Sequence, residues 1–318
     1  MQMDVVTIGE TMVMFTPQTT GLLRYAKNFT LSYAGAETNV AIGLSRLGHR
    51  VGWISQVGQD ELGESLISFV RGEGIDVSQV KKHPTAPTGL YIKEYLNQKE
   101  VRIYYYRHQS AASMMDRRNI DTDYISRAKF LHITGITPAL SGSCREMIFE
   151  AIDAAKVHGV KVVFDPNYRA KLWDAETAKP VLLEIAARSD IILPGIDEAR
   201  LLLGKSDPEE IANDLFHLGA QLVVVKLGPE GAYYQSKKEV GFVAGFPVDE
   251  VVDPVGAGDA FAAGFLSGLL EGLSLESAVQ RGNAAGALVV MVRGDYEGLP
   301  QRETLMRFMK ASGQDVLR

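Results

Sequence analysis

The sequence predicts an α/β protein with a mostly parallel central sheet, helices on both faces of that sheet, and a small projecting β-sheet lid. Three observations carry this prediction. Short, continuously apolar strands alternate with helices along most of the chain, which is typical of a parallel sheet buried on both faces. Two segments break this alternation with half-polar strands. The length of 318 residues is compatible with one large α/β domain.

The main body is expected to contain the following elements, in order. Buried strands are predicted at Val5–Gly9, Val51–Gly58, Phe130–Ile133, Val160–Phe164, Asp190–Leu193 and Leu222–Lys226. Helices are predicted at Asn39–Leu47, Leu62–Glu73, Ser143–His158, Ala175–Ala187, Asp197–Leu203 and Pro208–Leu218, and a further one begins near Ala260. Gly48 and Gly74 directly follow the first two helices, where glycine commonly ends a helix.

The segments Thr11–Thr16 and Thr88–Tyr106 alternate polar and apolar residues. Within the second segment, Asn97–Glu100 is predicted to be the turn of a hairpin. Such half-exposed strands do not fit the centre of a parallel sheet. We therefore expect a single domain over residues 1–318, with lid insertions at about 11–34 and 88–110.

Charge and composition exclude several classes of function. The formal net charge is −6 and the sequence has no basic tract, which argues against a nucleic acid or an anionic membrane as partner. The single Cys144 cannot form an internal disulfide, and the six histidines lack metal-ligand spacing. No stretch approaches 18 apolar residues, and no basic leader precedes the first strand. We expect a cytoplasmic protein.

The segment Asp253–Phe261 reads Asp-Pro-Val-Gly-Ala-Gly-Asp-Ala-Phe and is the most informative part of the chain. A glycine-rich turn that leads into a helix presents unpaired backbone N–H groups and suits an anion. Asp259 lies inside this predicted anion site. A carboxylate there makes sense if it accepts a proton beside a phosphate. The alternative interpretation is that Asp259 simply caps the helix.

Asp253–Phe261, followed by Ala263-Gly264-Phe265, resembles the C-terminal signature of the ribokinase-like (PfkB) carbohydrate kinases. Gly35-Ala36-Glu37-Thr38-Asn39-Val40-Ala41, followed by Leu44 and Leu47-Gly48, is similar to the N-terminal signature of the same family. The resemblance covers essentially the whole chain. It implies a ribokinase-like three-layer α/β/α fold and ATP-dependent phosphorylation of a sugar, with ATP and Mg²⁺ as cofactors.

Phosphoryl transfer requires positioning, charge neutralisation and a base for the hydroxyl proton. Asp259 is the candidate base. The amides of Gly256, Ala257 and Gly258 are the candidate donors to the charge that develops on the phosphoryl group.

The resemblance also implies nucleotide contacts. The predicted ATP-binding residues, besides the turn at 256–258, are Lys226, Leu227, Gly228, Pro229, Glu230, Gly231, Asn167, Tyr168, Arg169 and Asn283. By itself the turn at 226–231 is more often a plain connection between strands, and Asn283 is equally typical of helix packing. The family usually has Asn-x-x-Glu where this chain has Gly195-Ile196-Asp197-Glu198. Glu198 is therefore expected to act on Mg²⁺ through water, while Gly195 has no polar role.

The substrate is expected to bind between the N-terminal signature and the lid. Gly35 permits close approach of a sugar, and the Asn39 amide can bond hydroxyls, although Asn39 is also a good N-cap. Tyr105 and Arg107 point the same way on their strand and are the preferred lid contacts. The full set of predicted substrate residues is Gly35, Ala36, Glu37, Thr38, Asn39, Tyr91, Tyr105, Tyr106, Arg107, Arg169, Asp259 and Asp295.

Two arginines, Arg107 and Arg169, near one small sugar favour a substrate with a carboxylate, because a buried unpaired cation is unfavourable. Arg169 has the alternative of serving the ATP phosphates. Tyr91, Tyr105-Tyr106-Arg107, Asn167-Tyr168-Arg169 and Asp295 resemble one branch of the family, the 2-keto-3-deoxygluconate kinases. Asp295 otherwise reads as a solvated loop residue.

Two other functions remain open at the level of sequence. A fructokinase or another ketohexose kinase would share the family signatures, and the departure at Gly195 leaves room for a non-catalytic sugar sensor. The exposed lid sheet has open edges, which proteins usually cover. We therefore expect a homo-oligomer through the lid, most simply a dimer.

Overall fold

The computed structural model describes residues 2–97 and 100–314, and it has two sheets. The larger sheet has nine strands in the order β13-β12-β11-β10-β9-β8-β1-β4-β5. Its strands are β1 Val5–Ile8, β4 Val51–Gly58, β5 Val80–His83, β8 Phe130–Thr134, β9 Lys161–Asp165, β10 Ile191–Ile192, β11 Leu222–Lys226, β12 Gly231–Ser236 and β13 Val240–Ala244. In this order every neighbouring pair between β11 and β5 is parallel, whereas β12 pairs antiparallel with both β11 and β13.

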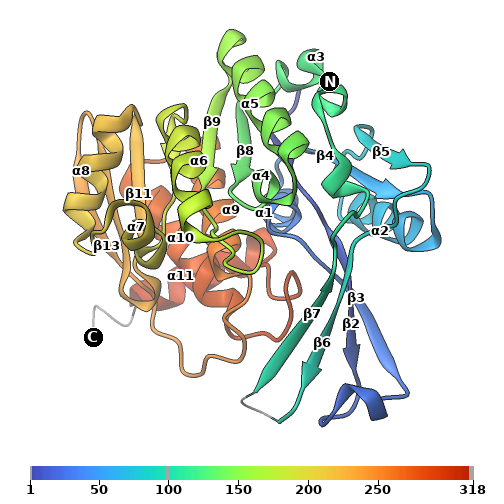
Figure 1. Ribbon diagram of the computed structural model, residues 1–318. Helices are drawn as coiled ribbons and strands as arrows, with labels where there is room; N and C mark the ends of the chain where they lie inside the picture. Colours follow the sequence, from blue (N-terminus) through green and yellow to red (C-terminus); the bar gives the residue numbers. More distant parts are fainter. Residues whose placement is uncertain (1, 98–99, 315–318) are drawn as a thin grey trace.

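Helices cover both faces of this sheet (Figure 1). The longer ones are α1 Ala36–Arg46, α2 Glu61–Gly72, α5 Gly142–Val157, α6 Ala175–Ala187, α7 Ile196–Leu203, α8 Pro208–Leu218, α9 Ala257–Leu270, α10 Leu275–Val289 and α11 Arg302–Gln314. The shorter ones are α3 Thr122–Ile125, α4 Thr137–Leu140 and the 3₁₀ turns η1 Leu23–Tyr25, η2 Ala112–Met114, η3 Arg117–Asn119 and η4 Gly228–Glu230.

One hydrophobic core lies on each face of the sheet, between the strands and the covering helices, because successive side chains of each strand point to opposite faces. Val6 packs in the core that contains α5 to α8, whereas its neighbour Val5 packs in the core that contains α1, α2, α9 and α10. In β9, Val162 likewise packs in the first of these cores and Val163 in the second. The predicted three-layer α/β/α architecture is confirmed.

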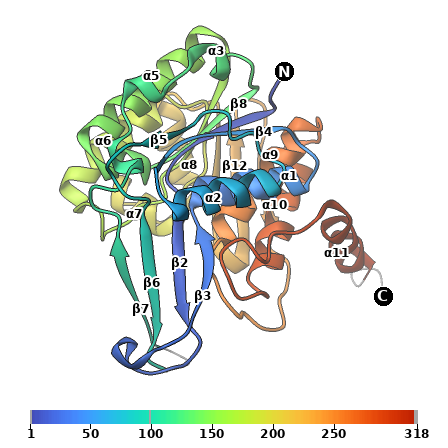
Figure 2. The same cartoon turned by 90° about the vertical axis from the view of Figure 1, so that its right-hand side faces the viewer.

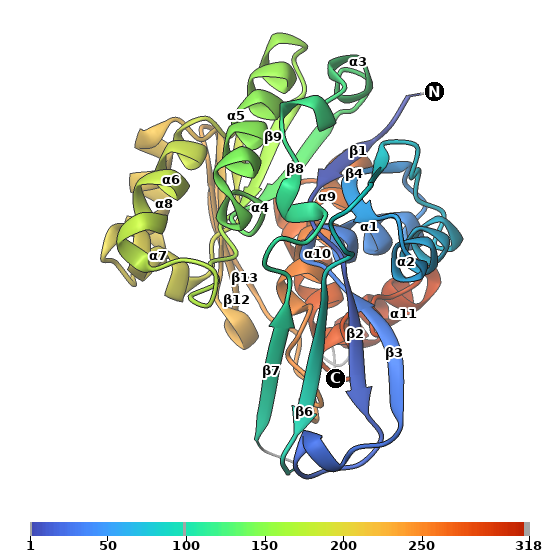
Figure 3. The same ribbon diagram turned by 45° about the vertical axis from the view of Figure 1, so that its right-hand side comes forward.

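The second sheet is the lid and has four strands in the order β3-β2-β6-β7. Its strands are β2 Met12–Pro17, β3 Phe29–Ala34, β6 Leu90–Tyr95 and β7 Val101–Tyr106. Figures 2 and 3 show it projecting from one end of the molecule, away from α5. All four strands lie within the predicted insertions. The central residues of the predicted hairpin turn, Gln98 and Lys99, lie outside the described residues.

The start of α1 differs from the prediction. The helix begins at Ala36, with Gly35 as its N-cap, and not at Asn39. The polar residues Glu37, Thr38 and Asn39 are all buried in its first turn. They interrupt the apolar spacing that marks a helix, so the periodicity becomes visible one turn late.

Candidate active site

One cavity of about 1080 Å³ lies between the lid and the carboxyl ends of the parallel strands. Its wall includes Glu10 after β1, Ile136 after β8, Asp165 at the end of β9, Gly195 after β10 and Lys226 at the end of β11. Strand ends of a parallel sheet meet at one edge, and this edge is where open α/β sheets bind ligands. The lid contributes the opposite wall.

The turn at 256–258 is shaped by its glycines. Gly256 has φ +79° and stands directly before α9, in a conformation that a residue with a side chain rarely adopts. A Cβ on Gly256 would lie 2.5 Å from the backbone oxygen of Asp295. At Gly258 a Cβ would point toward Lys226 Nζ, at 3.5 Å. The turn therefore brings backbone, without side chains, to the cavity wall beside a lysine.

Asp259 lies in the first turn of α9 and is 8 % exposed. Its Oδ2 accepts a hydrogen bond from Asn39 Nδ2 at 2.8 Å, and its Oδ1 one from Asn167 Nδ2 at 3.4 Å. The N-cap of the helix is Gly256, so the interpretation of Asp259 as a cap is wrong. Burial raises the pKa of Asp259 to about 8, although the bond from Asn39 opposes the shift.

Asn39 connects two carboxylates. The same Nδ2 that bonds Asp259 also donates to Asp295 Oδ1 at 2.6 Å. Asp295 is buried, and burial raises its pKa to about 6. Asp295 is thus not a solvated loop residue, and Asn39 does not cap a helix. Residues separated by more than 200 positions in the sequence form one buried group here.

Asn167 lies in the loop that follows β9 and has φ +39°. Positive φ is uncommon outside glycine, although asparagine tolerates it better than most residues. This conformation accompanies the contact of the Asn167 amide with Asp259. Non-glycine residues in such regions cluster at functional sites.

Lys226 is paired with Asp165 across the sheet edge, at 2.5 Å. Burial alone would lower the pKa of Lys226, but the carboxylates of Asp165 and Glu198 outweigh burial and hold it above its ordinary value. Glu198 accepts backbone N–H bonds from Tyr168 and Gly195. Burial raises the pKa of Glu198, and the nearby charge of Asp165 raises it further.

The lid wall is aromatic. The rings of Tyr91 and Tyr105 are 5.5 Å apart, and the guanidinium of Arg107 lies 5.8 Å from the Tyr105 ring. Lys171, from the loop after β9, reaches the same ring, with its Nζ at 5.6 Å from the centroid. Tyr105 therefore joins the lid to the loop that carries Asn167.

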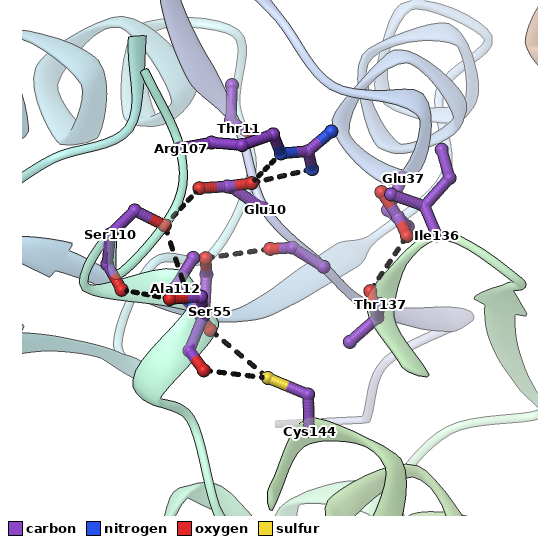
Figure 4. Close-up of polar contacts among 12 residues, drawn as sticks. Glu10, Thr11, Glu37, Ser55, Arg107, Ser110, Ala112, Ile136, Thr137 and Cys144 are labelled. Carbon is purple, nitrogen blue, oxygen red and sulfur yellow. Dashed lines mark hydrogen bonds and ion pairs between the residues drawn. The ribbon is translucent and has the colours of Figure 1, made fainter. Parts of the chain in front are cut away.

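Arg107 is not an unpaired cation, contrary to the argument from sequence. Its Nη2 and Nε lie 2.6 and 2.8 Å from Glu10 Oε2, and the Glu10 side chain is fully buried (Figure 4). Ser110 donates to the other oxygen, Glu10 Oε1, at 2.6 Å. Glu10 lies two residues after the end of β1, so its place at the carboxyl edge could be predicted from the sequence, but its pairing with Arg107 could not.

Glu37 lies at the cavity wall yet bonds inward. Its Oε1 accepts a hydrogen bond from Thr137 at 3.0 Å (Figure 4). It accepts a second one from Thr134 at 2.7 Å. Burial raises the pKa of Glu37. Gly9 lacks a side chain where Glu37 packs, since a Cβ there would lie 2.2 Å from the carboxyl carbon. These contacts anchor the start of α1 to the main sheet.

The structure brings most of the predicted residues to one cavity. Those that line it are Gly35, Ala36, Glu37, Asn39, Tyr91, Tyr105, Arg107, Asn167, Tyr168, Arg169, Glu198, Lys226, Leu227, Gly228, Glu230, Gly256, Ala257, Gly258, Asp259 and Asp295. Lining residues that the sequence argument missed include Glu10, Lys93, Asp165 and Lys171.

Several predicted residues are placed elsewhere. Tyr106 is 60 % exposed on β7 and is not part of the cavity wall, because strand alternation turns it away from Tyr105. Thr38 bonds to Gly35 and Thr11 inside the fold. The Asn283 amide donates to the backbone oxygens of Val243 and Ala244, which is its packing interpretation. Pro229 lies in the connection between β11 and β12 and Gly231 begins β12, and neither is part of the wall.

Residues 2–97 and 100–314 also lack two kinds of feature. They contain no group of three or more His, Cys, Asp or Glu side chains placed to hold a metal ion. None of their helices is long and apolar enough to cross a membrane.

Comparison with known proteins gives consistent matches over nearly the full length. The profile of the pfkB family carbohydrate kinases matches residues 2–302. A 2-dehydro-3-deoxygluconokinase of Bacillus subtilis (strain 168) is 44 % identical over 313 residues, which cover 98 % of this chain and 97 % of the relative. An enzyme of the same name from Thermoproteus tenax is 38 % identical, with 97 % and 94 % covered.

Solved structures give the same result. A PfkB protein from Polaromonas sp. JS666 superposes with a TM-score of 0.89 at 42 % identity, covering 96 % of this chain and 99 % of that one. A putative ribokinase II from E. coli, in complex with ATP and Mg²⁺, superposes with a TM-score of 0.88 at 28 % identity, covering 97 % and 99 %.

Proposed function

Because the chain belongs to the pfkB family of carbohydrate kinases, we propose that it phosphorylates the 6-hydroxyl of 2-keto-3-deoxygluconate (2-dehydro-3-deoxygluconate) with MgATP. The observation that carries the proposal is the arrangement of Asp259. This buried carboxylate stands beside a glycine turn at the wall of a large cavity, opposite a lid that carries Arg107. The names of the two relatives described above support the same substrate.

In the proposed reaction the sugar hydroxyl oxygen attacks the γ-phosphorus of ATP. The new P–O bond forms while the bond from that phosphorus to the ADP oxygen breaks, and the hydroxyl proton passes to Asp259. Asn39 and Asn167 hold the Asp259 carboxylate in place. A carboxylate whose pKa is raised to about 8 is a stronger base than an ordinary one, so it suits this proton transfer.

The ATP phosphates are proposed to meet the turn at 256–258 and Lys226. The N-terminus of α9 favours negative charge. Lys226 Nζ faces this turn near Gly258. Because Gly258 has no side chain, the turn leaves room for a phosphate at this point. Such donors raise the rate by stabilising the negative charge that develops on the phosphoryl group.

The residues also fit a magnesium ion that is held largely by water and phosphate. Asp165 Oδ1 is buried and has no hydrogen-bond partner in the described part of the chain, and Glu198 lies in the same wall. Magnesium prefers such hard oxygen groups and usually keeps several waters. When bound, the ion would neutralise charge on the phosphates. Asp165 and Glu198 would orient its waters.

Recognition of a sugar acid is proposed to involve Arg107 and Tyr105 on the lid side and Arg169 at the end near Asp259, with Asn39 and Asp295 bonding hydroxyls. Replacing Arg107 by alanine is expected to raise KM for the sugar acid about 10–100-fold, because a hydrogen bond to a charged group contributes about 1.5–3 kcal/mol. KM for ATP should change little. Steady-state kinetics with each substrate varied in turn measures both constants.

The Arg107→Ala variant leaves Glu10 buried without its partner, which destabilises a protein. The double variant Glu10→Gln/Arg107→Ala removes this lone charge and serves as control. It should recover thermal stability while keeping the high KM. If the single variant phosphorylates the acid with an unchanged KM, Arg107 does not bind it and a ketohexose kinase becomes the better assignment.

The direct test of the proposed reaction is product analysis. Wild-type enzyme, MgATP and 2-keto-3-deoxygluconate should yield ADP and sugar phosphate in equal amounts, with the phosphorus coupled to the protons at C6 in NMR spectra. Phosphate at another position, or release of inorganic phosphate without sugar phosphate, would contradict the proposal.

The lid is further proposed to join two copies of the chain. β3 and β7 are the outer strands of the lid sheet within the described residues, and exposed apolar side chains gather on the lid. Besides Tyr105, which lines the cavity, they are Leu22, Tyr25, Phe29, Leu31, Val101, Tyr104 and Tyr106. Covering such edges and side chains favours association. Sedimentation equilibrium at micromolar concentration is expected to give the mass of a dimer, and a monomer alone would overturn this point.

A further inference from the structure

The cations that line the cavity differ in whether a carboxylate of the protein already neutralises them. These cations are Lys93, Arg107, Arg169, Lys171 and Lys226. Lys93 pairs with Asp253 at 3.5 Å, Arg107 with Glu10 at 2.6 Å, and Lys226 with Asp165. Within residues 2–97 and 100–314, Arg169 and Lys171 form no ion pair at salt-bridge distance. Both are exposed. Among the cations that line the cavity, these two are available to neutralise a negatively charged ligand.

Arg169 lines the cavity two residues after Asn167, whose amide bonds Asp259, so it belongs to the reacting end. Burial dominates the pKa of Asp259 and of Asp295 and raises both, while the positive charge of Arg169 counteracts burial at each carboxyl group. The field of Arg169 therefore acts at the position where the hydroxyl loses its proton. Its charge is available to the phosphoryl group there.

Lys171 belongs to the lid end. Its Nζ lies 5.6 Å from the centre of the Tyr105 ring, and the guanidinium of Arg107 contacts the same ring at 5.8 Å. A lysine over a tyrosine face is held by cation–π attraction while its ammonium remains available to solvent or ligand. Arg107 supplies hydrogen-bond donors at this end, but Glu10 cancels its charge.

A six-carbon sugar acid carries its carboxylate at the end opposite its 6-hydroxyl. If that hydroxyl meets Asp259, the carboxylate points away from Asp259 and Asp295, whose charges would repel it, and toward the lid. We infer that Lys171 is a specificity-determining residue, whose ammonium supplies the net positive charge that selects a sugar carboxylate over a neutral sugar. This inference rests on the proposed function and extends it to a residue without a signature in the sequence.

The test compares Lys171→Met with Lys171→Arg, and with Lys179→Met as a control for loss of an exposed lysine elsewhere. Lys179 is exposed on α6 and lies outside the cavity wall. For each protein, KM and kcat are measured with 2-keto-3-deoxygluconate, with fructose and with ATP. The measurements with the acid are repeated at low and high ionic strength.

Lys171→Met should raise KM for the acid about tenfold, which corresponds to about 1.4 kcal/mol. KM for fructose and for ATP should stay unchanged, and Lys171→Arg and Lys179→Met should resemble wild type. Salt should raise the wild-type KM for the acid more than that of Lys171→Met, because an ion pair is screened. A role in structure alone would not alter the salt dependence.

The other possible results distinguish an error in the inference about Lys171 from an error in the proposed function. If wild type prefers the acid but Lys171→Met keeps its KM, or raises KM for acid and fructose alike, the inference about Lys171 is wrong while the proposed function stands. If wild type itself prefers fructose, the proposed function fails and the inference fails with it.

Discussion

Replacing Asp259 by asparagine is expected to lower kcat by about 10²–10⁴-fold, which is the usual contribution of a positioned base. Asparagine keeps the size of the side chain and can still accept the bond from Asn39, but it cannot take the hydroxyl proton. KM for ATP should change little, since the turn at 256–258 is intact. A coupled assay for ADP measures the rate, and undiminished phosphorylation would show that Asp259 is not the base.

The pH dependence separates loss of the base from loss of the fold. In wild type, kcat/KM should rise with pH up to about 8, because Asp259 must lose its proton and burial raises its pKa to about 8. This rise should be absent in the Asp259→Asn variant. A wild-type profile that is flat between pH 6 and 9 would contradict the assigned role.

The same pKa fixes the sign of the effect on stability. Burial raises the pKa of Asp259 from its ordinary value of 3.8 to about 8. Between these two pH values the native state therefore keeps a proton on Asp259 that the unfolded state has released. This contribution to stability is therefore fully present below pH 3.8 and is lost as the pH rises through 8. Asparagine does not titrate, so the variant should be at least as stable as wild type at pH 8 in thermal unfolding.

Replacing Gly256 by alanine is expected to lower kcat by about 10²-fold and to destabilise the protein by about 1–2 kcal/mol. The loss of stability follows from a side chain at φ +79°. The loss of rate follows because the new Cβ would lie 2.5 Å from the backbone oxygen of Asp295, so the turn or Asp295 must move. A displacement of about 1 Å near reacting groups costs about 10²-fold in rate.

Gly272→Ala is the matched control for this variant. Gly272 follows the other end of α9, has φ +74°, and a Cβ there would meet no atom within 4 Å. It should lose similar stability and keep its kcat. Equal kcat values for the two variants would show that the geometry of the turn at Gly256 is not needed for catalysis.

The sequence predicted the parts of the fold that depend on local pattern. The strands β4 and β11 and the helices α6 and α8 begin and end at the predicted residues, because apolar spacing and end signals agree there. The start of α1 was missed, because three buried polar residues hide the periodicity. The division into one domain with two lid insertions, and a cytoplasmic location, stay predictions.

The candidate site could be predicted where a short segment carries the chemistry. Asp259 and its glycine turn form such a segment. The pairing of Glu10 with Arg107 and the contact of Lys171 with Tyr105 could not be predicted, because each joins segments far apart in the chain by tertiary packing alone. These contacts change the argument for a sugar acid. Glu10 neutralises Arg107, so the unpaired positive charge at the lid end of the cavity belongs to Lys171.

The most direct test of the account compares an acidic with a neutral sugar on the wild-type enzyme. With saturating MgATP, kcat/KM is measured for 2-keto-3-deoxygluconate and for fructose in the same coupled assay. The site described here predicts phosphorylation of both by the same machinery, with kcat/KM for the acid higher by a factor of about ten or more, the equivalent of about 1.4 kcal/mol. Equal values, or a preference for fructose, would contradict the assignment of a sugar-acid kinase.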